Sequence, residues 1–128
     1  MKVRHGFVSN SSSTSFLVAL QNEYAEIFRE EFYASGDKGL YATIDCDGKE
    51  ELLKDMDRQI MRTWQNLFNT IKGKFERLEA LKAQREEIEH YDPEYSLMEI
   101  CYHSCYHRTG KIIEEYVKKD RLRYIKEV

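Results

Sequence analysis

Residues 60–88 carry a line of apolar side chains spaced alternately by four and three positions, and this seam limits the possible folds more than any other feature. Its members are Ile60, Trp64, Leu67, Ile71, Leu78, Leu81 and Ile88. Such spacing puts them on one face of an α-helix and leaves the opposite face to charged residues. The seam therefore predicts a long helix whose apolar face needs a partner helix, from the same chain or from a second copy.

We expect the partner to be a second helix that follows a short turn. Residues 47–50 resemble a capping box that opens the first helix, which runs to about His90 with Gly73 as the one place for a bend. Asp92 and Pro93 suit the cap and first turn of the second helix. One face of that helix would carry Leu97, Cys101, Ile112 and Tyr116. Residues 48–128 are thus predicted to form a long antiparallel α-helical hairpin.

The front of the chain has the periodicity of a small sheet with one covering helix. Residues 3–7 alternate, and the apolar run 16–20 has the length of an interior strand. Asn22 suits the cap of a helix that ends at Gly36, and residues 40–46 alternate as in a half-buried strand. The prediction is a single α+β domain over 1–128, with a ββαβ part over 1–47 and the hairpin over 48–128.

Composition and charge argue against several function classes. No apolar run approaches the roughly 20 residues of a membrane span. Residues 20–57 hold 11 acidic and 4 basic side chains, which argues against a dedicated nucleic-acid binder. Three cysteines make an odd count, so we expect an intracellular, reducing setting. Since no catalytic constellation is visible, we expect neither enzyme activity nor a cofactor.

Residues 101–107 contain a run of metal-ligand types, Cys-x-His-x-Cys-x-His. On a helix, Cys101 and Cys105 would share one face and the two histidines another, so one zinc ion could take one pair but never all four. Cys46 is the remaining cysteine that could complete such a set. A metal-dependent enzyme or regulator is therefore an alternative to cysteines that only fill the core.

Two further groups of side chains are predicted contact surfaces for a partner protein. Tyrosine is favoured at interfaces because it combines a large rigid ring with a polar tip. The tyrosine cluster consists of Tyr91, Tyr95, Tyr102 and Tyr106. The acidic front of the chain suits a basic surface on a partner. Its candidate contact residues are Glu30, Glu31, Asp45 and Asp47.

Residues 4–16 read RHGFVSNSSSTSF and resemble a short N-terminal signature, roughly R-x-GFVSNSSSSSF, of small uncharacterised proteins from bacteriophages and bacteria. Only Thr14 departs from its serine run. The resemblance implies a phage or prophage setting, in the host cytoplasm or the virion, and it implies no activity. The leading prediction is a non-enzymatic protein that docks on a host or viral protein. The alternative is a virion component that oligomerises through the seam.

Overall fold

A computed structural model describes residues 13–66, 71–103 and 107–127. Within these ranges the chain forms four strands and four helices, so the predicted α+β class is confirmed. In chain order they are β1 (Ser13–Gln21), α1 (Asn22–Ser35), β2 (Ala42–Asp47), α2 (Lys49–Gln65), α3 (Ile71–Glu89), β3 (Tyr95–His103), α4 (His107–Lys118) and β4 (Leu122–Glu127). The strand predicted at 3–7 lies outside the described residues.

The strands form one antiparallel sheet in the order β2-β3-β1-β4. β1 and β3 are central and pair along their whole length, from Ser13 opposite His103 to Gln21 opposite Tyr95. The apolar run 16–20 lies in β1, as predicted for an interior strand. A central strand is covered on both faces, which explains why its apolar residues are consecutive and not alternating.

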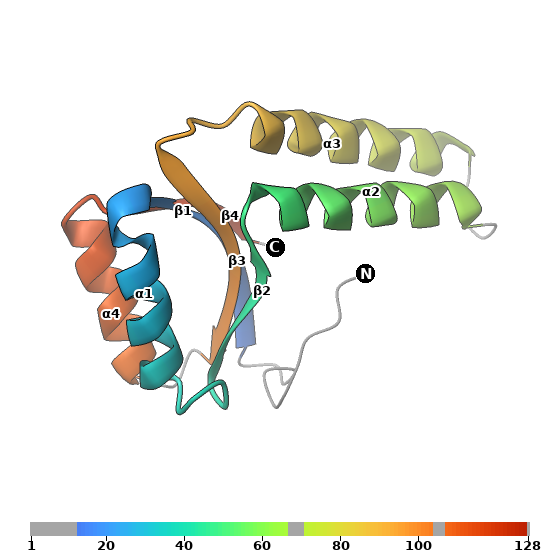
Figure 1. Ribbon diagram of the computed structural model, residues 1–128. Coiled ribbons are helices and arrows are strands. Elements are labelled where there is room, and N and C mark those ends of the chain that lie inside the picture. The colour runs from blue at the N-terminus through green and yellow to red at the C-terminus, as the bar shows by residue number, and fades with distance from the viewer. Residues whose placement is uncertain (1–12, 67–70, 104–106, 128) are drawn as a thin grey trace.

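The helices divide between the two faces of this sheet (Figure 1). α1 and α4 lie side by side over one face. α2 and α3 pack against each other as an antiparallel pair on the other face, at one end of the sheet, and extend well beyond it. We call this pair the arm, the end next to the sheet its root and the far end its tip.

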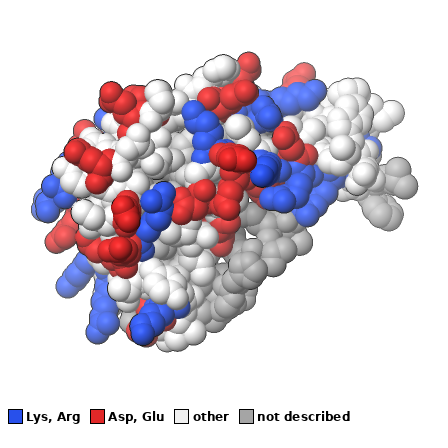
Figure 2. Space-filling view, in the orientation of Figure 1, with Lys and Arg blue, Asp and Glu red and all other residues white. Residues whose placement is uncertain are grey.

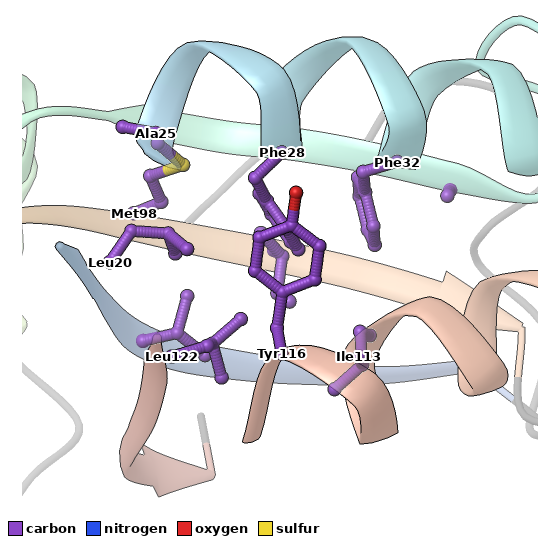
Figure 3. Packing of buried hydrophobic residues seen from close by; sticks show 11 residues of the cluster. Leu20, Ala25, Phe28, Phe32, Met98, Ile113, Tyr116 and Leu122 are labelled. Carbon is purple, nitrogen blue, oxygen red and sulfur yellow. The ribbon is translucent and has the colours of Figure 1, made fainter. Parts of the chain in front are cut away.

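The face under α1 and α4 has an aromatic core (Figure 3). The rings of Phe28 and Phe32 stack with their centroids 5.3 Å apart, and Tyr116 meets Phe28 edge-on at 5.1 Å. Ile113 of α4 and Leu122 of β4 pack into the same cluster. Large buried side chains from both helices thus join α1 and α4 to the sheet.

Gly36 marks the end of α1, as predicted, and its lack of a side chain has a packing reason. A Cβ atom at this position would lie 2.5 Å from the Cβ of Ala42, the first residue of β2. Such a contact is far inside van der Waals distance, so the chain can return to the sheet here only with glycine.

The helix starts differ in detail from their predicted caps. Asn22 does not cap α1: its side-chain Nδ2 donates to the carbonyl of Pro93 (2.9 Å), and its Oδ1 accepts from Ser96 Oγ (2.7 Å). At the start of α2, the backbone N–H of Asp47 donates to Glu51 (2.6 Å), a residue later than the predicted partner. Asn22 therefore ties α1 to the segment that enters β3.

The predicted second helix of the hairpin is wrong over residues 95–103, which form the central strand β3, and residues 122–127 form β4. Its later part, with Ile112 and Tyr116, is helical as α4, but it packs over the opposite face of the sheet from α2 and α3. A helical hairpin does exist, but both of its helices come from the segment predicted as one long helix. The break falls between Gln65 and Ile71, whereas Gly73 lies inside α3. Residues 97–101 are all buried, because the sheet is covered on both faces here. This burial fixes them in a strand, although their sequence suits a helix.

Candidate functional site

The arm divides the predicted seam into a packed part and an exposed part. Leu78, Leu81 and Ile88 are buried, and Ile60 is half-buried. Near the root, Leu81 and Ile88 of α3 form one cluster with apolar residues of α2 and of the sheet, namely Leu52, Met56, Leu17 and Leu97. Trp64 and Ile71 lie at the tip and are exposed, and Leu67 lies outside the described residues. The seam is therefore mainly an internal contact of the chain, with an uncovered end.

Four large apolar side chains are exposed together at the tip of the arm. Their exposed fractions lie between 49% and 77% for Met61, Trp64, Ile71 and Phe75. The rings of Trp64 and Phe75 meet edge-on with centroids 6.1 Å apart, so α2 and α3 each supply an aromatic ring to one patch. Scattered surface apolar residues need no explanation, but an apolar cluster that contains tryptophan is typical of interaction sites, so the tip is a candidate site.

Basic side chains accompany the apolar patch. Between Met61 and Phe75 the charged residues of the sequence are all basic, namely Arg62, Lys72 and Lys74. On the face shown in Figure 2, acidic side chains lie among the basic ones nearer the sheet, and lysine and arginine side chains extend farther out along the arm, next to uncharged atoms at its outer end. The tip thus combines apolar surface with positive charge, within a chain whose net charge is −3.

Polar contacts between α2 and α3 hold the arm together at both ends. Near the root, Arg85 of α3 donates to Asp57 of α2 (2.7 Å), and this hydrogen bond raises the pKa of the Arg85 guanidinium. Arg85 also donates to Glu89 within its own helix (3.1 Å). Near the tip, Lys74 Nζ donates to the backbone carbonyl of Trp64 (3.2 Å). These contacts are exposed and individually weak, but together they keep the two helices in register.

The predicted tyrosine surface is not one surface. Tyr91 and Tyr95 meet edge-on (6.0 Å) beside the root of the arm, where burial raises the pKa of Tyr91. Tyr102 lies on the opposite face of the sheet, with its ring against Phe16 (5.8 Å) and Phe32 (6.4 Å). Tyr106 lies outside the described residues. The described tyrosines of this set pack on the protein's own core, so they are poor candidates for a shared contact surface.

The predicted acidic contact residues also make internal contacts. Arg29 of α1 forms a two-pronged ion pair with Asp47 of β2 (2.8 and 3.0 Å). Glu31 accepts a hydrogen bond from the hydroxyl of Tyr116 (3.2 Å). Asp45 accepts a hydrogen bond from Thr43 (3.1 Å). Glu30, on the exposed side of α1, retains the surface position that the sequence predicted for this group.

The helix on which the predicted metal ligands depended does not form around Cys101. Cys101 is buried on β3, and Cys105 lies outside the described residues, so the helical face on which their pairing depended does not exist. Cys46 instead lies opposite Glu99 in the β2–β3 pairing and next to Asp55 of α2. We call these three residues the root cluster. The sequence pattern does not reveal this cluster, because it predicts a helix over residues 95–103, and only on a strand does Glu99 lie opposite Cys46.

No protein family, curated protein or solved structure matches the chain. Among the described residues, no helix is both long and apolar enough to span a membrane. The candidate sites therefore depend on their own geometry: an exposed tip that can bind, and a buried root cluster that can hold an ion.

Proposed function

We propose that the protein is a non-enzymatic binding protein that docks on a host or viral protein through the tip of its arm. One observation carries the proposal: Met61, Trp64, Ile71 and Phe75 are exposed together where the two helices project furthest from the sheet. Burying one such side chain is worth about 1.5–3 kcal/mol. A partner that covers the patch would therefore gain several kcal/mol from few residues.

The charge around the tip defines the partner's chemistry. A complementary surface has an apolar groove rimmed by aspartate or glutamate, because Arg62 and Lys72 flank the apolar side chains. Two tips of this protein facing each other would bring like charges together. Electrostatics thus favours an acidic partner protein over a symmetric contact between copies.

The arrangement of the rings favours a protein partner over single-stranded nucleic acid. Bases stack on the flat faces of aromatic side chains, whereas Trp64 and Phe75 are turned edge-to-face toward each other. The aliphatic members, Met61 and Ile71, offer no stacking surface. Methionine, tryptophan and arginine are typical of protein interfaces. The fixed spacing of two packed helices also suits a groove of defined shape better than a fluid membrane.

The phage or prophage setting is part of the proposal and is supported by the resemblance of residues 4–16 alone. The last four positions of that string lie in β1, where Ser15 and Leu17 are buried on the arm side of the sheet. Its C-terminal end therefore contributes to the fold, and we assign the docking role to the arm.

Site-directed photocrosslinking in the native host tests the proposal. A photoreactive amino acid replaces Met61 at the tip or, as a matched control, Ile27, an exposed apolar residue of α1 on the opposite face. We expect the tip position to capture one acidic protein that the control position does not capture. That protein is then purified, and its affinity for the wild-type chain is measured by calorimetry.

Tip variants then decide whether the captured protein is a specific partner. Trp64→Ala with Phe75→Ala is expected to weaken binding by roughly 700-fold, since hot-spot side chains contribute about 2 kcal/mol each and 1.4 kcal/mol is tenfold in affinity. Ile27→Ala should leave the affinity unchanged. Equal affinities of wild type and tip variant would overturn the proposal. So would crosslinks from Met61 to a second copy, to nucleic acid or to lipid, and the first of these would support the virion alternative.

A further inference from the structure

We propose that the root cluster, Cys46, Asp55 and Glu99, is a binding site for one divalent transition-metal ion of the Zn²⁺ type. The Cys46 sulfur and one carboxylate oxygen each of Asp55 and Glu99 lie within 4.8 Å of one another. The three residues come from three elements, β2, α2 and β3, which pack together at the root of the arm. Only the tertiary fold brings them together.

The burial of these groups points to a cation. Their residues are only 4% to 8% exposed, and the neighbouring side chains include Leu52, Met56 and Leu97. Placing two carboxyl groups and a thiol together in an apolar layer is costly, unless they are neutralised by protons or by a positive ion. A single divalent cation would serve all three groups at once.

The donor set selects the kind of metal. Zn²⁺ binds thiolate sulfur at about 2.3 Å and carboxylate oxygen at about 2.0–2.2 Å, commonly in tetrahedral geometry. Mg²⁺ and Ca²⁺ prefer oxygen ligands alone, so the sulfur of Cys46 argues against them. Three protein ligands would leave one coordination position open, which is the pattern of sites that also bind water or a small ligand.

A cavity of about 160 Å³ adjoins the cluster and supplies that space. Asp55 and Glu99 line it together with Gln59, Arg77 and Lys126. Gln59 Nε2 donates to Asp55 Oδ2 (2.8 Å), a hydrogen bond of the kind that orients carboxylate ligands in metal sites. Glu127 also lines the cavity, so Arg77 and Lys126 face three carboxylates there, with a thiol next to them, and a divalent cation would bring this local charge closer to balance.

Zinc titration of the full-length chain, followed by calorimetry and thermal unfolding, tests the site. We expect one Zn²⁺ per chain and a higher Tm with zinc, since a ligand that binds only the folded state stabilises it. Cys46→Ser, Asp55→Asn and Glu99→Gln should each weaken zinc binding by 10-fold or more, because even outer-shell changes cost about 10–100-fold. The matched controls are Cys101→Ser, a buried thiol on the same strand as Glu99, and Asp57→Asn, an exposed carboxylate two residues from Asp55. Both should bind zinc like the wild type.

Cobalt substitution identifies the sulfur ligand in a variant that keeps Cys46 and lacks the other two thiols. In the double variant Cys101→Ser, Cys105→Ser, Cys46 is the sole thiol, and Co²⁺ should still give a thiolate-to-cobalt charge-transfer band. Cys46→Ser should abolish that band. The proposal is overturned if the double variant gives no band, or if the wild type binds no zinc. The second result would mean that the carboxyl groups are balanced by protons or by the nearby Arg77 and Lys126 instead.

Discussion

The two faces of the sheet are built from different kinds of side chain. Under α1 and α4 the core is apolar and aromatic, and its buried hydroxyls, Ser35 and Thr109, lie 3.2 Å apart and hydrogen-bond each other. On the arm side the apolar cluster includes Cys46, and two acidic residues, Asp55 and Glu99, are buried next to it.

This difference indicates that one face of the sheet mainly stabilises the fold, whereas the other carries the candidate sites. A face that only has to stabilise the fold can be filled with large apolar residues, as the α1–α4 face is. A face that keeps ionisable groups in its interior gives up stability, and natural proteins do this mainly at functional sites. The arm side therefore carries both candidate sites, the root cluster at the sheet and the apolar tip at the far end.

The largest expected effect lies on the α1–α4 face. Phe28→Ala removes a fully buried ring that contacts both Phe32 and Tyr116, and should lower the free energy of unfolding by about 3–5 kcal/mol. The matched control is Ile27→Ala, at the half-exposed residue that precedes Phe28 in the same helix. It should change the free energy of unfolding by less than about 0.5 kcal/mol. Urea unfolding measures both. Similar losses for the two variants would show that this face is not the stability core.

At the root cluster, when no metal is bound, we expect a substitution to raise the free energy of unfolding instead of lowering it. Asp55→Asn removes one of two carboxyl groups held within 4.8 Å of each other, and should raise the free energy of unfolding of chelator-treated protein by about 1–3 kcal/mol. With zinc present, the wild type should be more stable than Asp55→Asn, because the variant lacks a metal ligand. Asp57→Asn should instead lose up to about 1 kcal/mol, since it breaks an exposed ion pair with Arg85. A destabilised Asp55→Asn protein without metal would show that the two faces do not differ in this way.

Much of the fold was predictable where local pattern and tertiary environment agree. The run 16–20 is apolar enough for a strand covered on both faces, and α1 ends at Gly36, where a side chain would clash with Ala42. The seam correctly marked residues 60–65 and 71–88 as helical. It could not show that the helix folds back on itself, because a seam is satisfied equally by a partner from the same segment.

The segment 95–103 shows why the rest could not be predicted. Leu97, Met98 and Glu99 are good helix formers, and Pro93 just before them suits a helix start. Pairing with both β1 and β2 overrides this preference. The error also hid the root cluster: only on a strand does Glu99 lie opposite Cys46. A single acidic residue within an otherwise apolar strand was the one available signal.

A pH-dependent effect distinguishes the faces further. Burial, reinforced by the charge of Glu31, raises the pKa of Tyr116 from about 10 to about 12. The unfolded chain loses this proton near pH 10 and the folded chain only near pH 12, so stability from this group is complete below pH 10 and declines as the pH rises towards 12. Between pH 9 and 12, the free energy of unfolding of Tyr116→Phe should rise by about 2 kcal/mol relative to that of the wild type. Parallel pH profiles would contradict the shielding of this hydroxyl.

The smallest expected effect on stability lies at the tip, where binding should depend most on the side chains. Trp64→Ala removes a half-exposed ring whose edge-on contact with Phe75 is worth about 0.5–1.5 kcal/mol at most, and water already reaches much of its surface. We expect a loss below about 1 kcal/mol in urea unfolding. Leu81→Ala, in the same arm and on the same seam but buried, should cost about 2–5 kcal/mol. If Trp64→Ala were as costly as Leu81→Ala, the tip would be part of the core and unsuited to docking. A near-neutral Trp64→Ala that loses partner binding would instead show that an exposed tryptophan is kept there for contact with another molecule.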